Sequence, residues 1–111
     1  MGALTEGTDY EIVGINRGDV TNEIVIKTID TVDAADTLTV DLTDYGIKAT
    51  GLIGVLGFKH TTNNSVMVQE QPTTSVSSGT LTITVPSGSD NDARFYFVKG
   101  LSSETAADDE L

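Results

Sequence analysis

The chain has 111 residues, 17 of them acidic and six basic, which gives a formal net charge of −11 at pH 7. It has no cysteine and one histidine, which excludes a disulfide framework, thiolate chemistry and a metal centre built from several histidines of one chain. The lysines and arginines are scattered, whereas phosphate binding needs them clustered, so we predict no nucleic-acid partner.

Composition also indicates the fold class. About a third of the residues are Val, Ile or Thr, whose β-branched side chains fit a pleated sheet better than a helix. The length suits one domain. We predict an all-β chain with a flexible arm at residues 1–8, a β domain at 9–100 and an acidic disordered tail at 101–111. The longest apolar stretch is too short to span a bilayer, so we expect a soluble protein with no membrane partner.

Seven strands are predicted, in chain order, at residues 10–15, 20–29, 37–42, 50–60, 65–71, 80–85 and 94–99. The third and sixth alternate clearly between apolar and polar residues, with Leu38 and Val40 on one side of the former and Leu81 and Ile83 on one side of the latter. A single helical turn closed by Gly46 is expected after the third strand. The connections are short, which predicts a small antiparallel β-sandwich or a partly closed β-barrel.

The segment 50–60 is apolar on both faces, and we therefore predict a central strand covered on both sides. Gly51, Gly54 and Gly57 recur in it, but no helix follows to form a phosphate-binding loop, so close packing or bulges in a curved strand are expected. Residues 65–71 are expected to return as its hairpin partner. The Ser- and Thr-rich stretch 73–79 and the stretch 86–92 are predicted as loops.

No enzyme signature is found. His60 could form a catalytic triad with Ser65 and an aspartate, but Ser and Asp are too abundant in the chain for that combination to be informative. The sequence also has no Gly-x-Ser-x-Gly nucleophile elbow. We interpret His60 as an exposed histidine at the end of a strand. The sequence therefore predicts no catalytic residue, no cofactor and no enzymatic activity.

Two aspartate-rich stretches are candidate cation sites, because calcium takes six to eight oxygen ligands. One is residues 30–36, and the other contains Asp90 and Asp92. Neither matches the twelve-residue calcium loop with its central glycine and closing glutamate. We interpret both as solvated turns and predict no metal site, with Asp90 and Asp92 as the candidate ligands if a cation does bind.

Three segments follow one another in an order typical of a known family. A Thr-rich strand at 37–42 enters the turn that ends in Gly46 and Ile47, the strand Gly-Thr-Leu-Thr-Ile-Thr-Val follows at 79–85, and the aromatic strand 94–99 closes on Gly100. Over residues 9–100 the chain resembles the small all-β head decoration, or cement, proteins of tailed bacteriophages.

This resemblance implies a virion structural protein. Such a protein is made in the host cytoplasm, binds the outer surface of the assembled major capsid protein shell and stabilises the head, often as a trimer. It often docks by an N-terminal arm, for which the matching residues here are Ala3, Leu4, Thr5 and Tyr10. The charge agrees with this location, because a DNA-filled lumen disfavours an acidic chain and the capsid exterior does not.

Two other functions stay open. One is a tail or baseplate β-module, which is also a virion part but has a different partner. The other is a carbohydrate-binding or adhesion sandwich, although sugar binding favours exposed aromatic platforms and the chain has no tryptophan and only three tyrosines.

Overall fold

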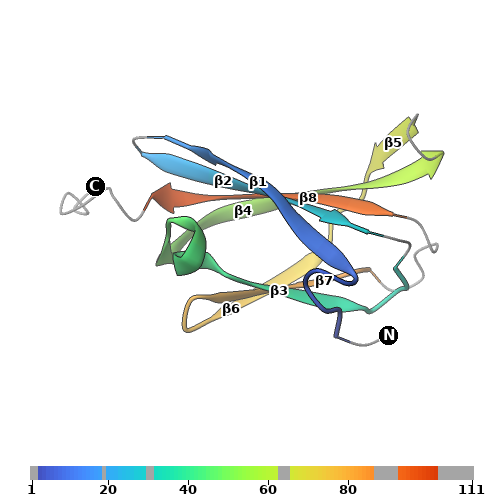
Figure 1. Cartoon of the computed structure of the whole chain (residues 1–111), viewed down its shortest axis with the longest axis horizontal. Coiled ribbons are helices and arrows are strands. Elements are labelled where there is room, and N and C mark those ends of the chain that lie inside the picture. The colour runs from blue at the N-terminus through green and yellow to red at the C-terminus, as the bar shows by residue number, and fades with distance from the viewer. Residues whose placement is uncertain (1–2, 19, 30–31, 63–65, 87–92, 103–111) are drawn as a thin grey trace.

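The computed structural model describes residues 3–18, 20–29, 32–62, 66–86 and 93–102, which form eight strands in two antiparallel sheets packed face to face (Figure 1). The larger sheet has the order β1-β2-β8-β4-β5, and the smaller has the order β3-β7-β6. Their bounds are β1 Tyr10–Arg17, β2 Thr21–Thr28, β3 Thr37–Asp41, β4 Ile47–Thr62, β5 Val66–Gln69, β6 Thr73–Ser77, β7 Thr80–Thr84 and β8 Arg94–Ser102. The predicted all-β sandwich is confirmed, and the two sheets do not close into a barrel.

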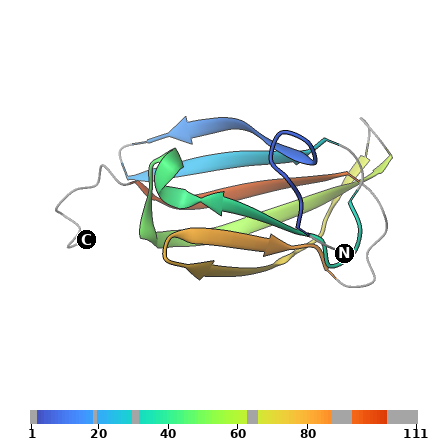
Figure 2. The same ribbon diagram turned by 60° about the horizontal axis from the view of Figure 1, so that its bottom comes forward.

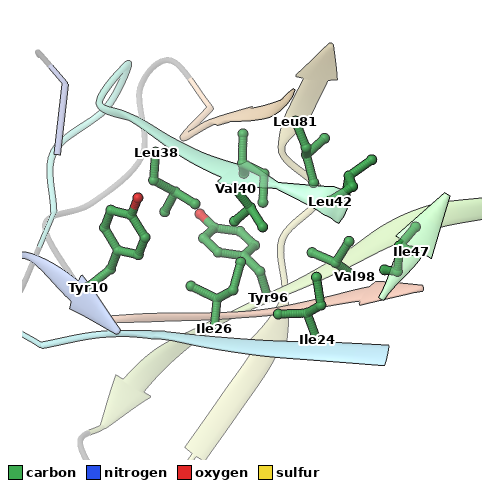
Figure 3. Close-up of a cluster of buried hydrophobic side chains, with 11 residues drawn as sticks. Tyr10, Ile24, Ile26, Leu38, Val40, Leu42, Ile47, Leu81, Tyr96 and Val98 are labelled. Atoms are coloured by element: carbon green, nitrogen blue, oxygen red, sulfur yellow. The ribbon is translucent and has the colours of Figure 1, made fainter. Parts of the chain in front are cut away.

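The core lies between the two sheets, where every second residue of a strand points inward (Figure 3). Ile24 and Ile26 of β2, like Tyr96 and Val98 of β8, are 0% exposed. They pack against Leu38 and other apolar side chains of the smaller sheet. Figure 2 shows the smaller sheet lying in front of the larger one. The inward positions predicted from alternation in the third and sixth strands are confirmed.

A 3-10 turn, η1 (Leu42–Tyr45), joins β3 to β4 where the sequence predicted one helical turn. The Asp41 carboxylate accepts hydrogen bonds from the backbone N–H and the hydroxyl of Thr43, at 3.2 and 2.9 Å. Gly46 ends the turn with φ of 80°, a left-handed conformation that glycine adopts without strain. The helical turn is therefore closed by Gly46, as predicted.

Strand β4 is long and bent. Its register against β8 shifts between Ile47 and Leu52 and again between Leu52 and Gly54, which confirms the predicted irregularity around the glycines. The prediction that both of its faces are covered is wrong. Ile53 and Leu56 are 57% and 42% exposed, because the smaller sheet covers one side of β4 only.

Two boundaries also differ from the prediction. The predicted loop 73–79 contains β6, an exposed edge strand paired with β7. Its hairpin turns through Ser78 and Gly79, which both have positive φ (51° and 82°), as a tight two-residue turn requires. Strand β8 continues to Ser102 instead of ending at Lys99. Residues 87–92 of the second predicted loop and residues 103–111 of the predicted tail lie outside the described residues.

The N-terminal segment was predicted as a flexible arm, and its described part instead packs on the domain. The N–H of Leu4 donates to the carbonyl of Thr37 at 2.7 Å, and the Leu4 side chain is half-buried against the core. The Asp9 carboxylate accepts a hydrogen bond from the N–H of Thr5 at 2.8 Å. Residues 3–9 therefore form a compact loop beside β3.

Candidate functional site

The larger sheet has one face on the core and a second face that no described part of the chain covers (Figure 1). We call this second face the outer face. Because strand residues alternate between sides, the neighbours of the buried residues on β2, β8 and β4 point outward. The outer face contains several large apolar residues, among them Val25, Ile53, Leu56, Phe58, Phe95, Phe97 and Leu101.

Aromatic rings form the centre of the outer face. Phe58 lies directly opposite Phe95 in the ladder between β4 and β8, and Leu56 lies opposite Phe97. The rings of Phe58 and Phe97 meet edge to face, with centroids 5.7 Å apart. The ring of His60 lies 5.4 Å from that of Phe95. These contacts fix the rings in place, so the apolar surface is preformed.

A shallow hollow of about 360 Å³ opens beside this aromatic centre. Gly54 forms part of its lining, and a Cβ added there would meet nothing within 4 Å, so the absent side chain helps to keep the hollow open. Ile53, Leu56 and Phe97 line its apolar wall, and Glu23 and Lys99 stand at its polar side. The hollow is of a size to receive an apolar side chain of a partner.

Charge on the outer face is balanced, in contrast to the chain as a whole. Glu11 on β1 lies directly opposite Lys27 on β2, and Glu23 on β2 lies directly opposite Lys99 on β8. Glu23 also accepts a hydrogen bond from the side-chain amide of Asn16 at 2.9 Å. Each acid on this face therefore has a base as its cross-strand neighbour, although the chain carries a net charge of −11.

The structure places the four predicted docking residues differently. Ala3 and Thr5 are exposed, and Leu4 packs on the core. Tyr10 is 3% exposed, and its hydroxyl donates to the carbonyl of Thr39 at 2.6 Å. Tyr10 is therefore a core residue in this fold and offers no surface to a partner.

The other residues singled out in the sequence do not form a site. Asp90 and Asp92 lie outside the described residues, as does Ser65. His60 is half-buried against Phe95, and β4 continues past it to Thr62. The Asp36 carboxylate accepts a hydrogen bond from the N–H of Asp33 at 2.8 Å, so it closes a turn. Among the described residues no three His, Asp or Glu side chains are grouped to hold a metal ion.

The outer face was missed at the sequence level, although a signal was present. The aromatic strand 94–99 was recognised, but its large residues occupy both faces, as they do in β4. Two adjacent strands of that kind indicate either a third layer or a surface that binds a partner. The described part of the chain supplies no third layer.

Comparisons with protein-family models, with curated proteins and with solved structures found no match. The described residues include no helix with the length and apolar character needed to cross a membrane.

Proposed function

We propose that the protein is a virion structural protein, a decoration protein that binds the outer surface of an assembled shell of major capsid protein. The observation that carries this proposal is the outer face, a preformed and charge-balanced apolar surface on a strongly acidic domain. The order of strand motifs in residues 37–100 also supports it.

The chemistry of the outer face suits a protein partner. Ile53 and Leu56 are more than 40% exposed, and transfer of such a side chain out of water is worth up to about 1.5–3 kcal/mol. The two cross-strand Glu–Lys pairs rim the apolar centre and provide polar contacts at the border. A flat surface of this kind gives modest affinity for one copy, and many copies on a lattice add their contacts through multivalency.

The acidic residues favour the exterior of a shell. Asp33, Asp41 and Asp44 lie on or beside the smaller sheet, away from the outer face. When the outer face is bound, these carboxylates stay in water, where they carry no desolvation penalty. Inside a filled head, the same charges would face packed DNA phosphates. In the trimer that the family resemblance implies, three outer faces would contact the shell together.

The test is co-sedimentation with expanded shells purified from the virus that encodes the chain. Leu56→Asp places a carboxylate in the apolar centre and should weaken binding by about tenfold or more. Thr39→Asp is the matched control, because it adds the same charge at an exposed position of the smaller sheet and should bind like the wild type. Thermal unfolding would verify that both variants are folded.

Two outcomes would contradict the proposal. One is wild-type protein that stays in the supernatant with intact shells. The other is equal pelleting of the two Asp variants, which would exclude the outer face as the binding surface. Mass spectrometry of separated heads and tails would show whether the protein belongs to a tail or baseplate instead.

A further inference from the structure

The two sheets have four edge strands, β1, β5, β3 and β6, and an edge strand presents a row of backbone donors and acceptors to its surroundings. Two of these edges carry protection. Strand β1 contains Glu11 and Arg17 and bulges around Val13, which disrupts pairing with another strand. Strand β3 is covered at its start, where Ala3 bridges to Thr37.

Strand β5 has no such protection. It consists of Val66, Met67, Val68 and Gln69, has no charged residue, and has no strand on its outer side among the described residues. Its three apolar side chains are 46%, 47% and 41% exposed, so both faces of the strand are partly open to solvent. Strand β6 is also uncharged, but hydroxyl-bearing residues make up most of it.

The hairpin of β4 and β5 projects from one end of the sandwich (Figure 1). Strand β8 pairs with β4 as far as Lys59, which lies opposite Arg94, and the N–H of His60 donates to the carbonyl of Ala93 at 3.0 Å. Among the described residues, β4 beyond that point pairs only with β5. A two-stranded ribbon is marginally stable in water, and a third strand on its free edge would stabilise it.

Charge indicates which partner this edge accepts. Residues 45–69 contain no Asp or Glu, although the chain has 17 acids, and they include Lys48, Lys59 and His60. Two copies that each carry a net charge of −11 repel each other wherever acidic surfaces meet. Strand β5 itself carries no acidic residue, so pairing through it places no carboxylate within the paired strands, and charges more than a Debye length of about 8–10 Å away are largely screened.

We propose that β5 pairs antiparallel with β5 of a second copy across a two-fold axis. The contact joins the two five-stranded sheets into one continuous sheet and brings Met67 and Val68 of each copy against apolar residues of the other. It uses an edge of the sheet and leaves the outer face free. On a shell bound through the outer faces, it would link neighbouring copies side by side, but it does not depend on that function.

Val68→Glu tests the pairing in the isolated protein. Val68 lies opposite Lys59 on β4, so the new carboxylate has a base as cross-strand neighbour within its own hairpin and the hairpin should stay folded. Across the two-fold axis, two such carboxylates repel each other. Val76→Glu is the matched control, because Val76 is 40% exposed and lies on the edge strand β6.

Sedimentation velocity from ~10 µM to ~1 mM should show a monomer–dimer equilibrium for the wild type and for Val76→Glu, since short strand contacts are weak. Val68→Glu should raise the dimer dissociation constant by about tenfold or more. Hydrogen exchange should show protection of residues 66–69 that increases with concentration, with no such change at 73–77.

Three results would overturn the proposal. They are a wild type that stays monomeric at every concentration, an assembly that Val68→Glu leaves unchanged, and an assembly whose mass is that of three chains. Each concerns the isolated protein, so a negative result here is distinct from a failure to bind shells.

Discussion

The two faces of the larger sheet have similar side chains and different surroundings. On the inner face, Ile26 and Tyr96 are 0% exposed beneath the smaller sheet. On the outer face, Leu56 is 42% exposed, and Phe97 is half-buried against its neighbours alone. An apolar strand residue is therefore not necessarily a core residue. In an antiparallel sandwich the second layer covers one face, and apolar residues on the other face indicate an interaction surface.

Removing the cation of the buried charge pair on the inner side of the sheet should have the largest effect on stability. The Arg94 side chain is 0% exposed, and its guanidinium contacts the Glu70 carboxylate at 2.7 and 3.3 Å. Arg94→Met would leave that carboxylate, which is 13% exposed, without this cation, and should lower the free energy of unfolding by about 4 kcal/mol in urea titrations. The outer-face change Lys99→Met should cost about 1 kcal/mol or less.

The double variant Arg94→Met with Glu70→Met tests whether the lost stability comes from leaving a buried carboxylate without its cation. It should recover a large part of the lost stability, because no unpaired charge stays behind. If Lys99→Met were as destabilising as Arg94→Met, the contrast between the two faces would be wrong.

Truncation of apolar side chains compares the two faces directly. Ile26→Ala would leave a cavity between the sheets and should cost about 3 kcal/mol. Leu56→Ala removes atoms that are already partly in water and should cost about 1 kcal/mol or less. Chemical denaturation of both variants measures the difference, and equal losses would mean that the outer face is packed like a core.

Alanine substitutions at two glycines of β4 should give smaller changes in stability that differ clearly from each other. A Cβ on Gly57 would lie 2.5 Å from the carbonyl oxygen of Glu70 and 2.8 Å from Cδ of Pro72, because residues 70–72 cross β4 there on their way to the smaller sheet. Gly57→Ala should therefore cost about 2 kcal/mol through overpacking. Gly54→Ala meets nothing within 4 Å and should change stability by about 0.5 kcal/mol or less.

Thermal unfolding of Gly57→Ala and Gly54→Ala would measure both changes in stability. Gly54→Ala also narrows the hollow on the outer face, so a loss of shell binding without a loss of stability would place a partner side chain in that hollow. A destabilised Gly54→Ala would instead show that the bend in β4 needs glycine at this position.

Much of the fold could be predicted because alternation is a local signal. Leu38 and Val40, like Leu81 and Ile83, alternate with threonines and identify their strands and inward faces directly. Strand β6 was missed because all of its residues are exposed and no apolar face marks it. The turn at Ser78 and Gly79 was the available signal, since Gly with a small polar residue between two β-branched runs indicates a hairpin.

The remaining wrong predictions depend on contacts between residues that are far apart in the sequence. Gly100 was predicted to end its strand, but β8 continues through it. A Cβ at this position would lie 2.5 Å from Cγ2 of Ile47, so the close approach of β4 requires glycine here. The burial of Leu4 depends on the carbonyl of Thr37, which is distant in sequence. The outer face could not be located because its exposure depends on how many strands the smaller sheet has and where they lie.

The smallest expected effect is a dependence of stability on pH that comes from a buried residue of the inner face. Tyr96 lies on the inner face, and its hydroxyl is buried without a hydrogen-bond partner among the described residues. Burial raises the pKa of Tyr96 to about 12, with the Glu70 charge adding to the rise and Arg94 opposing it. Because the folded protein retains the phenolic proton more tightly than the unfolded chain, the stability is fully present below pH 10 and falls as pH rises from 10 to 12.

Tyr96→Phe removes both the unpaired hydroxyl and its titration. At pH 8 the variant should be as stable as the wild type or up to about 1 kcal/mol more stable, because no buried polar atom is left unpaired. At pH 11 its advantage should be about 1 kcal/mol larger than at pH 8. Urea titrations of both proteins at the two pH values measure this difference, in which the titrations of the other tyrosines and the lysines cancel. An advantage that does not change with pH would mean that the Tyr96 hydroxyl ionises as readily in the folded chain as in the unfolded one, and that the inner face is wetter at this position than its packing indicates.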